Sequence, residues 1–289
     1  MHSEAGPADL SGRVCLVTGA SSGLGKEIAR GLARRGAEVV LGVRHVTRGE
    51  LARAEIVKDG HNLDVTVMQL DEASPENIRD FASRLRKTHG ALHVLVNSAS
   101  RWHEKREVTP EGIEQTWASH VVGPYLLTLE LAALLGAGAP SRVINVVSPV
   151  AAELDLSDVG WQRRPYDAAK AYLESKQALR LLTAGLACRL NPLRITINAV
   201  SPGFVRPELA EGGGGAKGAL FPMQAGTPEQ GAEAVVWACT SPMLEQISGR
   251  YLADRQVHPL KFDDPSQIDE VERICARLVT APAGAPVHV

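Results

Sequence analysis

Short runs of apolar, often β-branched residues alternate along the chain with longer segments in which apolar residues recur every three or four positions. The short runs predict strands at 13–19, 37–43, 64–71, 92–97, 141–148, 194–203 and 249–254. The longer segments predict helices between them, of which the clearest lie at 24–36, 110–135, 167–190 and 228–240. We therefore expect an α/β fold, with a Rossmann-type doubly wound parallel sheet of about seven strands and helices on both faces.

The alternation continues without a linker, so we expect one domain over 11–289 after a flexible tail at 1–10. A glycine-rich stretch at 208–226 (ELAEGGGGAKGALFPMQAG) interrupts the alternation late in the chain. It is typical either of a disordered surface loop or of a mobile lid near 204–226 that covers a site. Its position after the carboxyl end of a strand favours the lid.

Composition narrows the classes of partner. The chain has 289 residues, of which 44% are apolar and 22% charged, and its formal net charge is −2. This balance, without a long basic run, argues against nucleic acid or an anionic membrane as the main partner. No apolar run approaches the ~18 residues that a membrane span needs, and the N-terminal segment lacks the pattern of a signal peptide. A small molecule is therefore the expected partner.

The cysteines are far apart in sequence and form neither a CxxC motif nor a cluster with histidine: Cys15, Cys188, Cys239 and Cys275. We expect buried free thiols rather than a disulfide pair or a metal site. Free thiols agree with a reducing, cytoplasmic compartment.

The segment TGASSGLG (18–25) joins the first predicted strand to the first predicted helix and carries closely spaced glycines. Glycine lets the backbone approach a pyrophosphate, and a helix N-terminus offers amide groups and partial positive charge. A strand before the glycines and a helix after them are the context that this motif needs. We therefore expect a dinucleotide to contact Gly19, Ser21, Ser22, Gly23, Leu24 and Gly25.

The end of the second strand bears on the choice of dinucleotide. A nicotinamide cofactor without a 2′-phosphate usually meets an acidic residue there, whereas this sequence has Arg44 in LGVRHVTRG. A guanidinium pairs with phosphate and stacks on adenine, so we expect NADP(H) rather than NAD, with Arg48 as a second candidate contact. The alternative is that Arg44 is only the solvated end of a strand.

The segment PYDAAKAYLESKQA (165–178) holds two tyrosine–lysine pairs with the same spacing: Tyr166 with Lys170, and Tyr172 with Lys176. On a helix, residues four apart share a face, so either pair could transfer a proton. The two tyrosines project about 120° apart and cannot occupy the same place. The spacing alone leaves the choice open.

Several motifs together resemble the short-chain dehydrogenase/reductase family over residues 11–255. They are TGASSGLG, LDEAS (70–74), NSAS (97–100), HVVGPYLLT (120–128), INVVSPVA (144–151), SPGFVRPEL (201–209) and ISGRYLAD (247–254). The last motif and the stretch GKEIARGLARRGAEVVLGVRHVTRGE are similar to the retinol-dehydrogenase-like branch, which prefers NADP. The resemblance implies an oxidoreductase that transfers hydride between NADP(H) and a carbonyl carbon.

The resemblance also implies the roles of particular residues. The catalytic serine of the family corresponds to Ser148, and the family asparagine that holds a proton-relaying water corresponds to His120. The resemblance assigns cofactor contacts to Asp71, Asn97, Ala99, Pro202, Gly203 and Val205, and to the catalytic tyrosine and lysine. It further implies a homodimer or homotetramer assembled through the two long helices.

The chemistry explains why such residues are needed. Reduction of a carbonyl requires a proton donor at its oxygen, and an unperturbed tyrosine hydroxyl has a pKa of about 10. A nearby lysine cation lowers that pKa toward working pH and can also hold the nicotinamide ribose. A serine hydroxyl orients the carbonyl and stabilises the developing negative charge.

We assign the proton donor to Tyr172 and Lys176. After this lysine, an unbroken apolar stripe follows at helical spacing: Leu179, Leu182, Leu186 and Leu190. The family pattern of a small residue two positions after the lysine is met by Ala178. We expect Pro165 in the first helical turn, which would place Tyr166 at the helix entrance near the substrate mouth. If Tyr166 were the donor, Glu174 would fall in the early core.

Two departures from the family pattern stand close to these residues. Histidine at position 120 can donate and accept hydrogen bonds and titrates near neutrality, so it could keep the proton relay, re-route it or abolish it. Ser100 replaces the usual glycine and suggests a tighter cofactor edge. Neither departure removes the proton donor.

The substrate is not encoded in a readable motif. The polar loop at 100–108 (SRWHEKREV) is either a solvated surface or, through Trp102, part of the substrate mouth, for which Tyr166 and Phe204 are further candidates. We expect a small, largely apolar ketone, aldehyde or alcohol, and the Ala-, Arg- and Gly-rich composition suggests a secondary-metabolite intermediate. The alternatives are a cofactor-binding regulatory or scaffold protein without turnover, and a redox-neutral epimerase or dehydratase of the same fold.

Overall fold

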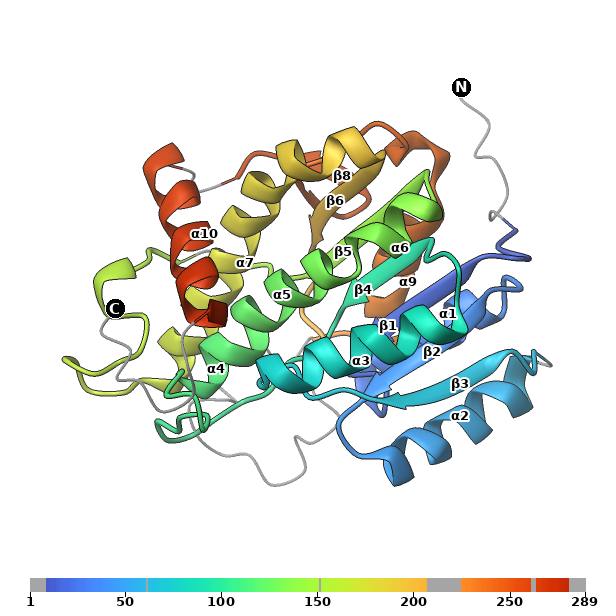
Figure 1. Cartoon of the computed structure of the whole chain (residues 1–289), viewed down its shortest axis with the longest axis horizontal. Coiled ribbons are helices and arrows are strands. Elements are labelled where there is room, and N and C mark those ends of the chain that lie inside the picture. The colour runs from blue at the N-terminus through green and yellow to red at the C-terminus, as the bar shows by residue number, and fades with distance from the viewer. Residues whose placement is uncertain (1–8, 61, 151, 207–224, 261–263, 281–289) are drawn as a thin grey trace.

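The computed structural model describes residues 9–60, 62–150, 152–206, 225–260 and 264–280. Within them, eight strands form one sheet in the order β3-β2-β1-β4-β5-β6-β7-β8 (Figure 1). The strands are β1 Val14–Thr18, β2 Glu38–Val43, β3 Val65–Gln69, β4 Val94–Asn97, β5 Ser141–Val146, β6 Ile195–Val200, β7 Arg250–Ala253 and β8 Gln256–His258. All neighbours are parallel except β7 and β8. The prediction of a parallel α/β sheet is confirmed, and the strand beyond the predicted number is β8.

The order of the strands changes direction between β1 and β4. β2 and β3 lie in turn on one side of β1, whereas β4, β5 and β6 lie in turn on its other side. The loops that leave β1 and β4 therefore diverge at the carboxyl edge of the sheet. In an open α/β sheet this switch point is where ligands bind.

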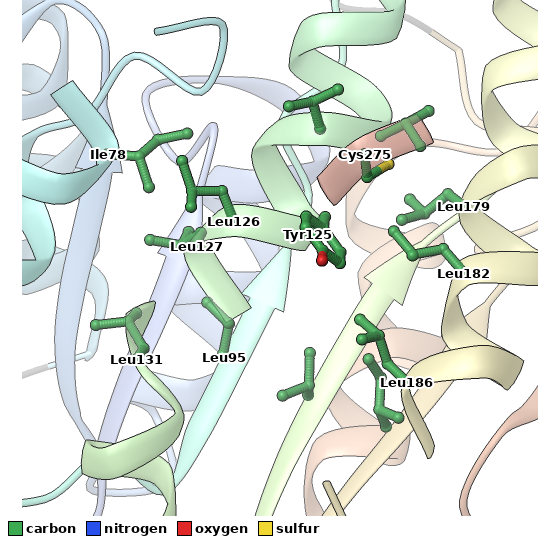
Figure 2. Packing of buried hydrophobic residues seen from close by; sticks show 14 of the residues in the cluster. Ile78, Leu95, Tyr125, Leu126, Leu127, Leu131, Leu179, Leu182, Leu186 and Cys275 are labelled. Atoms are coloured by element: carbon green, nitrogen blue, oxygen red, sulfur yellow. The ribbon is translucent and has the colours of Figure 1, made fainter. Parts of the chain in front are cut away.

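Helices cover both faces of the sheet. One face carries α3 (Pro75–Thr88), α5 (Gly123–Glu130), α7 (Ala168–Leu190) and α10 (Pro265–Thr280). The other carries α1 (Gly23–Ala33), α2 (Val46–Gly60) and α9 (Pro228–Thr240). Successive strand residues point to opposite faces, so Leu16 packs into the first core and Val17 into the second. The predicted stripe on α7 is buried in the first core (Figure 2).

The long helix expected at 110–135 has a more varied path. It begins only at Gln115, because the Glu114 carboxylate accepts the backbone N–H groups of Thr116 and Trp117 and caps the helix. The segments that follow are α4 Gln115–Trp117, the π-helical turn η1 Ala118–Val122, α5 and, after Leu131, α6 Ala132–Ala137. The π turn contains His120, and such turns are frequent at functional sites.

The helix α7 begins at Ala168, where Asp167 caps it by accepting the backbone N–H groups of Ala169 and Lys170. The expectation that Pro165 lies in the first helical turn is therefore wrong. An acidic cap two residues later ends the loop instead, so Tyr166 lies outside the helix. The short 3-10 helices in the connecting segments are η2 Leu156–Asp158, η3 Asn191–Leu193 and η4 Pro242–Leu244.

The helix α10 was not predicted, although the apolar positions of 265–280 have helical spacing. Its inner side packs against α7, α5 and η1. Figure 2 shows Cys275 of α10 in the same core as Tyr125 of α5 and Leu179 of α7. The C-terminal helix therefore covers part of the surface of α5 and α7. The family resemblance predicted that two copies of the chain would associate through the long helices.

All four cysteines are free, as expected, but only three are buried, because Cys188 lies on the exposed side of α7. In the part of the chain that is described, no helix combines the length and apolarity of a membrane span. The same residues contain no cluster of three or more His, Cys, Asp or Glu side chains that could hold a metal ion.

Candidate active site

The loops after β1 and β4 meet at the switch point with almost no space between them. A Cβ atom on Gly19 would lie 2.7 Å from Cα of Ala99, and one on Gly25 would lie 2.5 Å from the carbonyl oxygen of Gly19. Gly19 and Gly23 also have positive φ angles of 64° and 52°. The turn therefore requires glycine for backbone conformation and for close packing.

The N-terminus of α1 opens toward this turn. Ser22 occupies the N-cap position, but its side chain makes no capping hydrogen bond. The N-terminus of α1 offers backbone N–H groups and partial positive charge, both of which suit a pyrophosphate. Ser21 and Leu24 lie half-buried beside it. The residues present therefore fit the dinucleotide that the sequence predicts.

Arg44 directly follows β2, as expected, and is half-buried. Its Nε donates to Nε2 of the exposed His45 at 3.1 Å, and no described carboxylate forms an ion pair with it. Arg48 lies one turn into α2 and is exposed. The edge where an NAD-binding protein would carry an acid thus carries positive charge.

The other predicted cofactor residues line the same carboxyl edge. Leu24, Pro202 and Val205 converge on one point of α9, where a Cβ on Gly231 would lie 2.3 Å from Val205, 3.3 Å from Leu24 and 3.3 Å from Pro202. Gly203 follows with a φ of 76°. The loops after β1 and β6 are therefore packed together on the start of α9.

Asp71 and Asn97 have mainly internal contacts. The Asp71 carboxylate accepts the N–H of Ala73 at 3.1 Å. The buried Asn97 side chain donates to Asn145 at 2.7 Å, and Asn145 in turn donates to Thr183 of α7 at 2.9 Å. Through this chain Asn97 ties the end of β4 to the helix of the tyrosine and lysine.

Tyr172 is half-buried at the start of α7. The ammonium of Lys176 lies 5.8 Å from its ring centre. The rings of His120 and Trp102 lie 5.7 and 5.8 Å from it. Burial raises the pKa of Tyr172, and the hydroxyl of Ser100 acts to lower it. The serine that departs from the family glycine thus lies close to the predicted proton donor.

Lys176 is buried beneath this tyrosine. Its ammonium donates to the carbonyl oxygen of Val146 at the end of β5, at 3.1 Å. Burial lowers the pKa of Lys176 to about 8, and the nearby carboxyl of Glu72 acts in the opposite direction. The lysine therefore exchanges its proton in the physiological range.

The side chain of His120 has no free ring nitrogen. Its Nε2 accepts the backbone N–H of Arg101 at 2.9 Å. Its Nδ1 lies 2.9 Å from the hydroxyl of Ser175, which donates its own proton to the carbonyl of Tyr172 at 2.7 Å. Nδ1 must therefore carry the proton, and the ring is neutral.

Complete burial, reinforced by the charge of Lys176, holds the pKa of His120 well below its ordinary value. The imidazole braces the loop after β4 against the second turn of α7 rather than exchanging protons with solvent. The sequence left open whether His120 keeps, re-routes or abolishes the proton relay of the family. Because both ring nitrogens are hydrogen-bonded to the protein, the geometry does not support a relay through this side chain.

Ser148 lies after β5 and is 7% exposed. Its Oγ accepts the N–H of Val150 at 3.1 Å, and its carbonyl accepts a hydrogen bond from Arg180 of α7. The hydroxyl proton remains available for a substrate oxygen. Ser148 lies two residues after Val146, whose carbonyl accepts the hydrogen bond from Lys176. The serine and the lysine are therefore both fixed at the carboxyl end of β5.

Tyr166 has a different environment from Tyr172. Its hydroxyl donates to the carbonyl of His103 at 3.2 Å and lies 3.3 Å from the Thr116 hydroxyl. Burial raises the pKa of Tyr166 to about 12, and its partner in sequence, Lys170, is exposed. This tyrosine fastens the loop at 100–108 to the start of α4 and is not placed as a proton donor.

The remaining substrate candidates lie at different depths. Trp102 packs on the ring of Tyr172 and bonds to Glu104 through its indole N–H, so it forms a wall of the site. Phe204 is 40% exposed on the loop after β6. The proposed lid falls largely on 207–224, outside the described residues, and its flanks meet in a bridge between Val205 and Gly226.

Sequence reasoning missed Glu72. This acid follows Asp71 in LDEAS and is 7% exposed. The Thr18 hydroxyl acts to lower the pKa of Glu72, and among the described residues its Oε1 has no hydrogen-bond partner. Burial raises the pKa of Glu72 to about 8, the same value as for Lys176. The sequence carries no clear signal for this burial, because Glu72 stands next to Asp71 in a polar segment after β3.

Glu174 is buried, although we used burial of this residue as a reason against Tyr166 as the donor. Arg164 binds both of its carboxylate oxygens, at 2.8 and 2.5 Å, and stacks on Trp161 at 3.6 Å. The ion pair offsets the cost of burial. It also anchors the loop that precedes α7 to the helix.

Comparison with known proteins decides the family. The model of the short chain dehydrogenase family matches residues 13–213. The chain belongs to this family. Retinol dehydrogenase 13 from Mus musculus is 34% identical over 286 residues, which span 96% of this chain and 84% of the relative. Retinol dehydrogenase 12 from Homo sapiens is 36% identical over 249 residues, 85% of this chain and 78% of the relative. The resemblance to the retinol-dehydrogenase-like branch is thereby confirmed.

Solved structures agree with the fold. An uncharacterized protein from Mycobacterium paratuberculosis superposes with a TM-score of 0.75 at 24% identity, over 97% of this chain and 98% of its own. The RhlG/NADP active-site complex from Pseudomonas aeruginosa has a TM-score of 0.68 at 25% identity, over 85% of this chain and 96% of its own. The solved structures therefore agree with an α/β fold that has helices on both faces of a single sheet, and the family match makes the protein an oxidoreductase of the short chain dehydrogenase family.

Proposed function

We propose that this short-chain dehydrogenase is an NADP(H)-dependent reductase of a small, largely apolar ketone or aldehyde, or the corresponding alcohol dehydrogenase. The observation that carries the proposal is the placement of Tyr172. The ammonium of Lys176 lies 5.8 Å from the centre of its ring, and the rings of His120 and Trp102 lie 5.7 and 5.8 Å from it. The loop after β4, which carries Trp102, also packs against the glycine turn that suits a dinucleotide, through Ala99.

The residues of the chain have distinct tasks in this proposal. Tyr172 gives its hydroxyl proton to the substrate oxygen. Ser148 donates a hydrogen bond to the same oxygen and stabilises its developing charge. Lys176 stabilises the tyrosinate that remains and holds the ribose. When bound, the nicotinamide supplies the hydride.

A screen of NADPH oxidation against aldehydes and ketones tests the proposal. The panel should include linear, cyclic and conjugated apolar carbonyls, among them retinal, because the relatives are named retinol dehydrogenases. Turnover with at least one class, strongly reduced but still measurable when Ser148 is changed to Ala, is the expected result. Cofactor binding without turnover across the panel would favour a regulatory protein instead.

That second candidate has one observation in its favour. The His120 imidazole is buried with both nitrogens engaged, so this side chain does not carry the family's proton relay. The contacts of the other site residues nevertheless favour turnover. Lys176 lies near the ring of Tyr172, and the Ser148 hydroxyl can still donate to a substrate. The same screen separates the two candidates.

The cofactor preference rests on Arg44. Changing Arg44 to Ala should raise the Kd for NADPH about 10- to 100-fold and leave the Kd for NADH within about twofold, because a charge-assisted phosphate contact is lost. Protein fluorescence titration of both nucleotides measures this. Arg53→Ala, an exposed arginine paired with Glu50 on α2, is the matched control. Equal affinities in the wild type, unchanged in Arg44→Ala, would contradict the NADP assignment.

We further propose a cytoplasmic enzyme, which the free thiols support. Assembly as a homodimer or homotetramer stays a prediction. Because α10 packs on α5 and α7, assembly through those helices would have to build on α10 or displace it.

A further inference from the structure

The helix α7 carries a buried arginine, Arg180, on the same face as Tyr172 and Lys176. Arg180 lies on α7 four residues after Lys176 and eight after Tyr172, so the three side chains share one helical face. It is only 2% exposed. Among the described residues no carboxylate forms an ion pair with it, and only Tyr251 favours its charged form. A buried cation without a counter-ion is costly unless it makes other contacts.

The contacts of Arg180 join three parts of the fold. Its Nη2 donates to the carbonyl oxygen of Ser148, and its Nη1 lies 3.4 Å from Oε1 of Gln177. The guanidinium carbon lies 4.1 Å from the ring centre of Tyr251 on β7. One cation therefore connects α7, the loop after β5 and β7.

Both cations of α7 donate to backbone carbonyls at the carboxyl end of β5. Lys176 donates to the carbonyl of Val146, the last residue of the strand, and Arg180 donates to the carbonyl of Ser148 in the loop that follows. The two hydrogen bonds therefore fix the segment that carries Ser148 to α7 at two points.

This arrangement leaves Ser148 fixed on two sides. Its Oγ accepts the N–H of Val150, and its carbonyl is held by the guanidinium. Arg180 does not touch the reacting atoms, because it lies beneath the serine in the protein interior. Any effect on the reaction must act through the position of the serine hydroxyl.

We propose that Arg180 is a positioning residue that sets the Ser148 hydroxyl for the substrate carbonyl, an inference that rests on the proposed function. The guanidinium supplies a hydrogen bond that no aliphatic side chain of similar length offers. Its stacking on Tyr251 keeps it in place without a carboxylate, whose negative charge would oppose the charge that develops on the substrate.

The test compares Arg180→Met with Arg180→Lys. We expect Arg180→Met to lower kcat roughly 10- to 100-fold, since small displacements of catalytic groups have effects of this size, with the Kd for NADPH within about twofold of wild type. Arg180→Lys should recover part of kcat, because an ammonium can still donate to the Ser148 carbonyl. Arg189→Met, an exposed arginine on the same helix, should keep the wild-type kcat.

A double-mutant cycle with Ser148→Ala separates positioning from general stability. If Arg180 acts through the serine hydroxyl, Arg180→Met should change kcat by no more than about threefold in the Ser148→Ala background. An equal loss in both backgrounds, or a wild-type kcat in folded Arg180→Met, would overturn the inference. Absence of turnover in the wild type would instead contradict the proposed function.

Discussion

Replacement of Tyr172 by Phe should lower kcat about 10²- to 10⁴-fold while NADPH still binds, because the change removes only the hydroxyl that gives its proton to the substrate. The Lys176 ammonium lies 5.8 Å from the ring centre, close enough to stabilise the tyrosinate that remains. Steady-state reduction kinetics and fluorescence titration of NADPH measure the two quantities.

Tyr166→Phe is the matched control for this change. It has the same spacing to a lysine, but Lys170 is exposed and burial raises the pKa of Tyr166 to about 12. Its loss should leave kcat within about fivefold of wild type, with any effect arising from a looser loop at 100–108. Turnover kept in Tyr172→Phe and lost in Tyr166→Phe would reverse the assignment.

The second large effect concerns the dependence of reduction on pH. Reduction needs the proton of Tyr172 and the cation of Lys176, whose pKa burial lowers to about 8. The reductive kcat/KM should therefore be level below pH 7 and fall by about tenfold per unit above pH 8, as the cation is lost. Glu72 titrates in the same range, so the observed value belongs to the pair.

Glu72→Gln should move this descending limb to lower pH. The Glu72 carboxyl raises the pKa of Lys176, and glutamine removes that charge. Glu76→Gln, an exposed acid on α3, is the control and should leave the profile unchanged. A descending limb at the wild-type pH or above it in Glu72→Gln would show that the two groups are not coupled.

Much of the fold could be predicted because it follows from local patterns. Apolar strand runs, the glycine turn after β1 and the leucine stripe of α7 depend on neighbours in sequence, and the structure has them where the patterns place them. The predicted bounds 167–190 match α7 within one residue, but Pro165 was wrongly expected in its first turn because Asp167 caps the helix instead. Both residues are common at the start of a helix, and the sequence does not show which of them will form the capping hydrogen bonds.

The contacts that set the chemistry could not be predicted, because they join residues far apart in sequence. His120 was recognised as a departure, but its role as a brace depends on Arg101 and Ser175. The charge coupling of Glu72 to Lys176 spans about a hundred positions, and the bond of Arg180 to Ser148 requires the register of α7 on β5. Family motifs predict which residues react, whereas the partners that tune them become visible only in the folded structure.

Transfer of label from NADPH tests the central claim most directly. The purified protein would be given NADPH deuterated at the transferred position of C4, with the best substrate of the carbonyl panel, and the product analysed by mass spectrometry. We predict one deuterium on the new carbinol carbon, with the yield lost in Tyr172→Phe and kept in Tyr166→Phe. A product without deuterium, or an equal yield from wild type and Tyr172→Phe, would contradict reduction by this site.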